Sequence, residues 1–527
     1  MIPADAFFLL DLSFQISKRC PRIWTPFSCI VAGERRMFAD TQAIGATRRS
    51  TVIIDFSMRI TDRSKALLAQ ISQGREMTRR DKLELAAWLS VPAVVAQFSS
   101  IVMQYIDASM VGSLGAEASA SIGLVTTTTW LFGGLCSACS TGFSVQVAHK
   151  IGANDLLAAR SILRQAFTTA FLFSIMLAVV GLSICRHLPL WLGGDASIVG
   201  DASLYFGIFS LSLPMLQLNF VAGGMLRCSG NMHVPSMMGV AMCMLDVLFN
   251  FLFIFPSHHF AVAGVHITIP GANLGVAGAA LGTVAAITII ALVQTWYLCN
   301  RSSLLRIAGE KGRFRPQRSI LRWALKIGFP MGMEHVVLCG AQIMTTVIVA
   351  PLGVFAIAAN SFAITAESLC YMPGLGISEA ATTLVGQSIG AARKTLARSF
   401  AYITVGMGML VMALMGILMY VFAPEFIGFM SPVEEIRQLG TAALRIEAFA
   451  EPMFAAAIVA YGVFVGAANT VVPCIMNVFS VWAVRLTLAA ALAPSLGLQG
   501  VWTAMCIELC FRGTIFLLRL FRGRWMK

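Results

Sequence analysis

The sequence predicts an all-α integral membrane protein in which twelve transmembrane helices form two pseudo-symmetric six-helix bundles. Three observations predict this fold: the composition, the number of apolar runs of bilayer length, and an internal repeat. Hydrophobic residues make up 57% of the 527 residues and charged residues only 12%, whereas soluble domains carry about 25% charged residues. The mean hydropathy of +0.79 requires many segments to face lipid, because a single anchor could not produce that average.

The first 82 residues differ from the rest of the chain. They contain 14 Lys and Arg and 8 Asp and Glu, and they hold no apolar run long enough to span a bilayer. No secretory cleavage pattern follows the short apolar stretch near residues 7–10. We interpret residues 1–82 as a basic, disordered cytoplasmic extension, or as the product of a mis-assigned start, with Met58 or Met77 as the true first residue.

Twelve apolar runs follow this extension. Runs of about twenty or more apolar residues predict transmembrane helices. The second and eighth runs are long for a single crossing, so they are expected to tilt or to project beyond the bilayer. The predicted spans are 83–106, 118–146, 162–187, 203–226, 234–256, 276–299, 327–350, 356–387, 399–423, 440–465, 472–493 and 499–519.

The positive charges predict the orientation of these spans. With the N-terminus inside, the cytoplasmic loops and the C-terminal tail hold nineteen Lys and Arg, while the outer loops hold only Arg186, Arg437 and Arg445. This asymmetry indicates that both termini are cytoplasmic. It also explains the net charge of +13 without a nucleic-acid partner. We therefore divide the chain into an N-lobe (83–300, helices 1–6), a basic cytoplasmic linker (301–326) and a C-lobe with a short basic tail (327–527).

The two halves repeat at a constant offset of 238 residues. Because apolar matches are expected by chance in so biased a composition, the strength lies in matching Pro, Gly and Asn residues. After the fifth helix, an insertion at about 257–272 changes the offset to 222. Six helices per half make the two repeats parallel, which is typical of transporters that rock two bundles against each other. The matches include Pro92 with Pro330, Gly152 with Gly390, Pro214 with Pro452, and Asn231 with Asn469.

Polar groups within the predicted N-lobe helices are the first candidates for chemistry, because ionisable residues are costly in a membrane and are commonly functional. Asp107 lies near the end of the first helix. Asp246 and Asn250 are four residues apart and therefore share one face of the fifth helix. With the Thr283 hydroxyl, these groups would form an oxygen-rich site for Na⁺ or for a stored proton. The alternative is that Asp107 only caps a helix near the outer water interface.

The other polar residues within predicted spans have less specific patterns. Glu508 and Arg512 are four apart, which favours an ordinary ion pair. Cys136 and Cys139 form an isolated CxxC without a second ligand pair, so no metal site is expected beyond possible Na⁺ at the N-lobe site. No catalytic constellation such as HExxH or a nucleophile elbow is present, and we expect no enzyme and no cofactor. The candidates for cavity or gating roles are Pro92, Glu334, Gln342, Glu367, Glu451 and Arg485.

A set of local motifs resembles one known family. Pro92 is followed fifteen residues later by Asp107, which leads into VGSLG at 111–115, and VAHKIGA follows the second helix at 147–153. RCSGN occupies 227–231 ahead of Pro235, and YMPGLG at 371–376 leads to ATTLVGQSIGA at 381–391. In combination, across about residues 80–520, these motifs resemble the bacterial branch of the MATE (multidrug and toxic compound extrusion) family of the MOP flippase superfamily.

The resemblance implies a function and assigns roles to residues. It places cation coupling on Asp107, and it places the family's polar pair of helix 5 and threonine of helix 6 on Asp246, Asn250 and Thr283. One departure is that a glutamate of helix 7 found in some members is replaced here by Leu338, which leaves a cation site in the C-lobe in doubt.

The resemblance therefore implies a secondary active exporter of small organic compounds, cationic or amphipathic, that works by H⁺ or Na⁺ antiport with alternating access. It would be a monomer in the bacterial inner membrane. The alternatives are a lipid-linked oligosaccharide flippase of the same superfamily, for which only Arg485 is an available cavity cation, and an exporter of an endogenous metabolite. A membrane-embedded enzyme, a channel or a receptor fits the pattern less well.

Overall fold

The computed structural model describes residues 63–262, 265–431 and 433–526. The chain divides into two compact units, Met1–Lys65 and Ala66–Lys527, and the second contains all the membrane-spanning helices. Most of the predicted extension 1–82 lies outside the described residues.

The first six-helix bundle, called the N-bundle, corresponds to the predicted N-lobe. Its first helix begins at a capping box in which the side chains of Thr78 and Asp81 each accept a hydrogen bond from the other residue's backbone N–H. A short helix, α7 (Leu188–Trp191), interrupts the connection between the third and fourth long helices. The long helices are α4 (Arg79–Gly112), α5 (Ala116–Gly152), α6 (Leu156–Ile184), α8 (Ala196–Cys228), α9 (His233–Ile254) and α10 (Gly275–Asn300).

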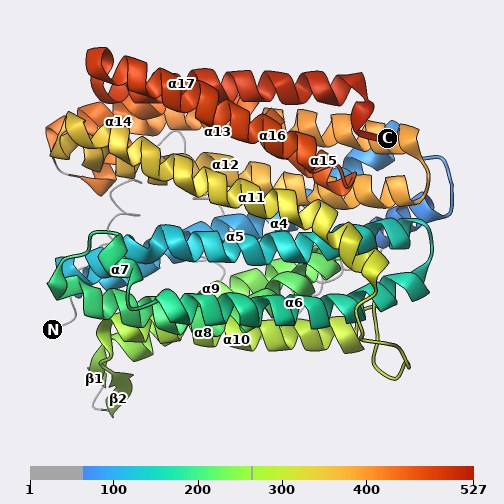
Figure 1. Cartoon of the computed structure of the whole chain (residues 1–527), viewed down its shortest axis with the longest axis horizontal. Coiled ribbons are helices and arrows are strands. Elements are labelled where there is room, and N and C mark those ends of the chain that lie inside the picture. Colours follow the sequence, from blue (N-terminus) through green and yellow to red (C-terminus); the bar gives the residue numbers. More distant parts are fainter. Residues whose placement is uncertain (1–62, 263–264, 432, 527) are drawn as a thin grey trace, which may run out of the picture. The chain divides into compact units, whose positions relative to one another are not determined.

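The second bundle, called the C-bundle, follows the predicted C-lobe and packs beside the first (Figure 1). Short 3₁₀ turns connect or end some of its helices at η1 (Ala350–Leu352) and η3 (Arg524–Met526). Its main elements are α11 (Arg318–Val349), α12 (Val354–Gly390), α13 (Lys394–Met430), α14 (Glu434–Glu447), α15 (Glu451–Gly466), α16 (Val471–Phe479), the π-helical segment η2 (Ser480–Leu486) and α17 (Thr487–Arg522).

The helices of the described residues account for the predicted crossings. Ten are long and apolar enough to span a membrane, and the pair α14–α15, bent by 59°, makes an eleventh. One of the ten is the 52-residue stretch Val471–Arg522. It folds back at Gly497, where φ is 59° and ψ is −139°, so it supplies two crossings (Figure 1). The twelve-helix fold is therefore confirmed.

Several helices extend beyond the apolar runs that predicted them. The helices α5 and α12 have 37 residues each, which is about 55 Å of helix for a hydrocarbon core of about 30 Å. Their projection beyond the bilayer thickness agrees with the prediction. The linker is shorter than predicted, because α11 already begins at Arg318 rather than near residue 327. Hydropathy marks only the lipid-facing part of a helix, whereas backbone hydrogen bonding continues into water.

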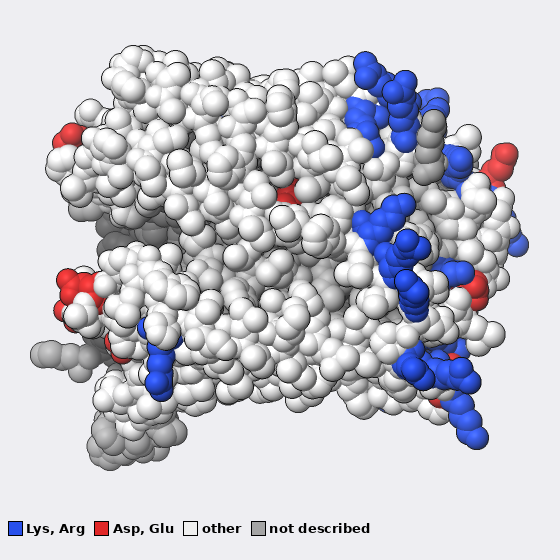
Figure 2. Space-filling model, in the orientation of Figure 1, with Lys and Arg blue, Asp and Glu red and all other residues white. Residues whose placement is uncertain are grey.

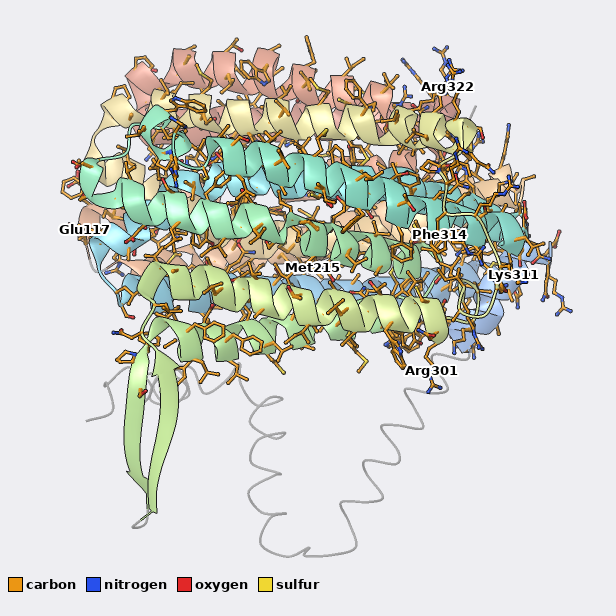
Figure 3. The ribbon with its side chains drawn as sticks, turned by 60° about the horizontal axis from the view of Figure 1, so that its bottom comes forward. Glu117, Met215, Arg301, Lys311, Phe314 and Arg322 are labelled. Atoms are coloured by element: carbon orange, nitrogen blue, oxygen red, sulfur yellow. The ribbon has the colours of Figure 1, made fainter. Side chains whose placement is uncertain are left out.

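Lys and Arg gather at one end of the two bundles (Figure 2). Figure 3 places Arg301, Lys311 and Arg322 at this end, and Glu117 at the opposite end. We call the first the basic end. The insertion predicted at 257–272 forms an antiparallel hairpin of β1 (Pro256–Val262) and β2 (Val265–Ala272), which projects from the opposite end (Figure 1).

The last part of the predicted extension is ordered, which corrects the prediction of disorder for its described portion. Residues 66–72 are helical, and Leu67 and Ile71 are buried against C-bundle side chains together with Met77. Arg393 donates from Nη1 to the carbonyl of Gln70 at 3.0 Å. The segment is amphipathic, and it buries its apolar face on a bundle that composition alone does not reveal.

Candidate functional site

The predicted N-lobe residues come together where α4, α9 and α10 meet. The Asn250 amide on α9 donates from Nδ2 to Asp107 Oδ1 on α4 at 2.9 Å, and also to Asp246 Oδ2 at 3.4 Å. Asp107 and Asn250 are 143 residues apart in the chain. Asp107 is therefore part of a polar cluster, and the alternative in which it only caps a helix at the water interface does not describe its position.

Two of the three members of the cluster are shielded from solvent. Asp246 and Asn250 are each 1% exposed, and Asp107 is half-buried. Asp246 Oδ1 and Asn250 Oδ1 have no hydrogen-bond donor among the described residues. Buried oxygen atoms in proteins are almost always satisfied, so these two atoms indicate a site where a proton or a cation can bind.

The helix α10 completes the site with two adjacent residues. The Thr283 hydroxyl interacts with the Asp246 carboxyl group, as the sequence led us to expect. Gly282 precedes it, and a Cβ at this position would overlap Asn250 Oδ1 and lie 2.9 Å from its backbone nitrogen. Gly282 therefore allows Asn250 to approach α10 closely. The sequence analysis did not select Gly282, because glycine carries no functional group, although its place beside Thr283 was a usable signal.

Tyr205 on α8 is a second residue that the sequence analysis missed. It lies close enough to Asp107 and Asp246 to interact electrostatically with both, and it packs among Val111, Ala118 and other apolar side chains. A tyrosine is common in apolar helices, so nothing local in the sequence marks it.

The cluster has the chemistry of a site for a small hard cation or a proton. Its donors are carboxylate, amide and hydroxyl oxygens, which are the ligands that hard cations prefer. The Asp107 and Asp246 carboxyl groups are close enough to interact directly. Two neighbouring carboxylates repel each other in a poorly solvated interior, and a proton or cation held between them would remove this repulsion.

Replacing Gly282 with Ala is expected to weaken cation binding at this site. The new methyl group would push Asn250 away from both carboxyl groups, so the affinity of the cluster for Na⁺ or a proton should fall by at least about tenfold, the loss of one hydrogen bond to a charged group. The measurement is calorimetric titration of the purified protein in detergent with Na⁺ and with acid. The matched control is Gly239→Ala on α9, where a Cβ would meet only Ala96 Cβ at an ordinary 3.7 Å. An unchanged cation affinity in Gly282→Ala would contradict the assignment.

The C-bundle contains a fully paired charge cluster on η2 and α17. Glu508 is 0% exposed. Its Oε1 accepts a hydrogen bond from the Ser480 hydroxyl at 2.6 Å, and its Oε2 accepts one from Arg485 Nε at 3.1 Å. Arg512 Nε lies 3.1 Å from Oε1. The predicted Glu508–Arg512 pair is thus confirmed. Arg485, a candidate for a cavity role, has its guanidinium paired with Glu508 at 3.0 Å.

Replacing Glu508 with Ala is expected to destabilise the protein by about 3–5 kcal/mol, because two poorly solvated guanidinium groups would lose their shared counter-charge. The measurement is thermal unfolding of purified protein in detergent. The control is Glu434→Ala, since Glu434 is 68% exposed and forms an ion pair with Arg437 at 3.3 Å. Exposed pairs of this kind contribute about 0–1 kcal/mol. Equal melting temperatures for the two variants would refute this account.

Glu334 is held by partners from two other helices. It accepts hydrogen bonds from Tyr461 Oη at 2.6 Å and from Asn477 Nδ2 at 2.5 Å, and it is 6% exposed. Because α11 begins at Arg318, Glu334 lies four turns inside the helix.

Three further carboxyl groups of the C-bundle lie close together. Glu447 and Glu451 flank the break between α14 and α15, both are 0% exposed, and none of their four carboxyl oxygens has a hydrogen-bond partner among the described residues. Glu367 on α12 is an electrostatic neighbour of both. The sequence analysis selected Glu367 and Glu451 but missed Glu447, because only the 59° bend turns both glutamates inward.

The remaining candidates lie apart from these clusters. Pro92 lies within α4 and is half-buried. Gln342 is exposed on α11 and accepts, through its backbone carbonyl, a hydrogen bond from Thr346 Oγ1 at 3.1 Å.

The bundles contact each other closely near the basic end through symmetry-related residues. A Cβ on Gly152 of α5 would overlap the carbonyl oxygen of Gln387 on α12, and a Cβ on Gly390 would overlap the carbonyl oxygen of His149. His149 Nε2 lies 2.7 Å from the Gly466 carbonyl, and Gln387 Nε2 donates to the Cys228 carbonyl at 2.9 Å. At the repeat offset of 238, His149 corresponds to Gln387 and Cys228 to Gly466. The hydrogen bond of His149 with Gly466 and that of Gln387 with Cys228 are therefore equivalent under the internal repeat. We call these two hydrogen bonds, with the neighbouring close contacts of Gly152 and Gly390, the paired latches.

Comparison with known families agrees with this architecture. The family model described as MatE matches residues 92–252 and 330–490, which correspond to the two bundles. The chain belongs to the MATE family. It is a MATE transporter of the MOP superfamily, and the family match confirms the resemblance that the sequence motifs indicated.

Similar proteins carry names of one kind. A probable multidrug resistance protein NorM of Thermotoga maritima is 26% identical over 83% of this chain and 92% of its own length. The multidrug resistance protein MdtK of Yersinia enterocolitica is 23% identical over 83% and 94%. Among solved structures, an outward-facing multidrug resistance MATE family transporter of the MOP superfamily matches with a TM-score of 0.77 at 19% identity, over 86% of this chain and 98% of that one. A MOP superfamily transporter from Pyrococcus furiosus matches equally well, with a TM-score of 0.77.

Proposed function

We propose that this MATE transporter exports small organic compounds, cationic or amphipathic, and that inward movement of H⁺ or Na⁺ drives the export. The observation that carries the proposal is the bridge from Asn250 to Asp107 and Asp246, beside buried oxygens that lack a donor within the described part of the chain. A cation bound there would change the charge at a helix contact, which is the physical requirement for coupling. The multidrug resistance names of the relatives support the substrate class.

The helix α4 connects the proposed cation site to the other bundle. Tyr105, two residues before Asp107, donates from its hydroxyl to the Thr365 carbonyl of α12 at 3.2 Å. Nearer the start of α4, Val94 contacts α12 so closely that a Cβ on Gly376 would lie 2.7 Å from the Val94 backbone nitrogen. Neutralising Asp107 would therefore change the packing of a helix that contacts both bundles. The cation drives transport only if it favours one of the two conformations.

The orientation follows from the positive charges. We place the basic end in the cytoplasm of a bacterial cell, with the bundle in the inner membrane. In this orientation the paired latches would close the cytoplasmic side. Alternating access requires these latches to separate when substrate enters from the cytoplasm.

The flippase alternative is less well supported by the C-bundle. A lipid-linked oligosaccharide carries phosphate groups, which would require free cationic side chains along its path. Arg485 and Arg512 both pair with Glu508, so neither guanidinium is available to a phosphate. Export of an endogenous metabolite would use the same cation site and would differ only in substrate.

The function is tested in proteoliposomes with an imposed pH or Na⁺ gradient. Purified protein should move a fluorescent organic cation only when one of the gradients is present, and collapse of that gradient with an ionophore should stop the movement. A drug-sensitive bacterial host should also grow at higher drug concentrations when it carries the gene. Absence of movement under both gradients, with folded protein in the vesicles, would overturn the proposal.

A further inference from the structure

A groove lies between the second half of α16 and the last turns of α17, toward the basic end of the C-bundle. Its volume is about 450 Å³. One part of its wall is apolar and comes from both helices, including Ile475 and Phe479 from α16 and Phe511 and Leu518 from α17. The rings of Phe479 and Phe511 lie 6.5 Å apart and join the two helices across the groove.

The apolar wall is open to the surroundings. Ile475 is 60% exposed, Phe479 is 55% exposed and Leu518 is 50% exposed. In a membrane-spanning helix, such side chains face acyl chains rather than water. The groove can therefore receive a hydrocarbon chain along most of its length.

The other part of the wall is strongly cationic. Arg519, Arg522 and Arg524 line the groove where it reaches the basic end, and its described lining contains no Asp or Glu. Arg398 adds a fourth guanidinium next to Gly523, since a Cβ there would lie 2.8 Å from Arg398 Nη2. Four arginines thus surround the last turn of α17 and its continuation.

These arginines have no acidic partner among the described residues, unlike several arginines that lie between helices elsewhere. Arg160, Arg227 and Arg485 each form an ion pair, whereas no carboxylate pairs with Arg522 or Arg524 among the described residues, and both side chains are exposed. Arg519 donates to Asn469 Oδ1 at 3.2 Å, and its guanidinium lies 5.5 Å from the centre of the Phe464 ring. Its Nε–H is buried and has no acceptor in the part of the chain that the structure describes.

We propose that this groove binds one anionic phospholipid of the leaflet at the basic end, with an acyl chain against Ile475, Phe479 and Leu518 and the headgroup phosphate against Arg519, Arg522 and Arg524. The combination of an apolar wall at membrane depth with clustered arginines at the interface complements such a lipid in both charge and polarity. Guanidinium groups bind phosphate oxygens with two parallel hydrogen bonds. A free phosphate ion would leave the apolar wall unused.

The binding would stabilise the contact between α16 and α17. The ion pair of Arg485 with Glu508 joins α17 to η2, the segment that continues α16, so a lipid at the basic end would add a second connection between the two helices. This proposal depends on the membrane fold and not on the transported substrate, so it can fail while the export function holds.

The experiment measures lipid retention by the full-length protein. The protein is purified in detergent, mixed with a defined ratio of phosphatidylglycerol and phosphatidylcholine, and passed through a sizing column, after which bound lipid is quantified by native mass spectrometry. Wild-type protein should retain phosphatidylglycerol in preference to phosphatidylcholine. The variant Arg522→Gln/Arg524→Gln should retain it about 30-fold more weakly, which is about fivefold for each arginine. This variant leaves the hydrogen bond of Arg519 to Asn469 in place, so folding is preserved.

The matched control removes two positive charges elsewhere at the basic end. Arg313 and Arg315 are exposed residues of the linker, and Arg313→Gln/Arg315→Gln should retain phosphatidylglycerol like the wild type. A second variant, Ile475→Ser/Leu518→Ser, tests the apolar wall and should also lose retention. Equal retention by the arginine variant and the control would overturn the proposal. So would full displacement of the lipid by inorganic phosphate alone, since this would indicate a simple anion site.

Discussion

Export driven by a cation gradient should fall to the level of protein-free vesicles when Asp107 is replaced with Asn. The amide has nearly the same shape as the carboxyl group. Unlike the carboxyl group, it cannot carry a negative charge, and it cannot bind and release a proton. It therefore removes the exchangeable charge from the cluster that Asn250 bridges, while leaving the apolar packing of α4 intact. The expected loss is complete because antiport requires the cation to bind in one conformation and leave in the other.

The measurement is efflux of a fluorescent organic cation from proteoliposomes, with the amount of folded protein determined by sizing chromatography. The matched control is Asp201→Asn, because Asp201 is an exposed aspartate of α8 outside the cluster. It should transport like the wild type. Normal transport by Asp107→Asn would remove Asp107 from the coupling mechanism, whereas loss of transport in both variants would show that the assay responds to surface charge.

Transport should fall by at least about tenfold when either Gly152 or Gly390 is replaced with Ala. A methyl group at these positions would overlap the backbone carbonyl of the opposite bundle, and a backbone cannot rotate away as a flexible side chain can. Overpacking of this kind costs about 1–3 kcal/mol. Here it would destabilise the conformation that is closed at the basic end. The protein should therefore shift toward the conformation in which the paired latches are separated.

Two measurements test this shift. Transport is compared with that of Gly133→Ala, a control on the same helix where a Cβ would meet nothing within 4 Å. The open fraction at the basic end is measured by alkylation of a cysteine introduced at Thr383, which donates to the Arg227 carbonyl between the bundles at 3.1 Å. Labelling should increase in the Gly152 and Gly390 variants and not in the control. Wild-type transport and labelling in both variants would show that the latches do not control access.

The positions of the helices, and part of the site, could be predicted from the sequence. A bilayer imposes a length and a polarity on each segment, so apolar runs identify helices without knowledge of their neighbours. The repeat offset follows in the same way from matching Pro, Gly and Asn residues. Helical spacing also places Asp246 and Asn250 on one face. The site could be predicted as far as the types of its residues and the helices that carry them.

The sequence alone determined the class of protein, the twelve crossings, the twofold repeat and the polar residues that a membrane would tolerate only for a reason. The tertiary structure decided which of those residues meet. It brought Asn250 to Asp107 across 143 positions, gave Glu508 two guanidinium partners instead of one, and turned Glu447 inward at a bend. Hydropathy and helical periodicity are properties of single segments, whereas a contact between helices depends on how their surfaces fit together. Gly282, Gly152 and Gly390 gain their importance only from the atoms that lie opposite them.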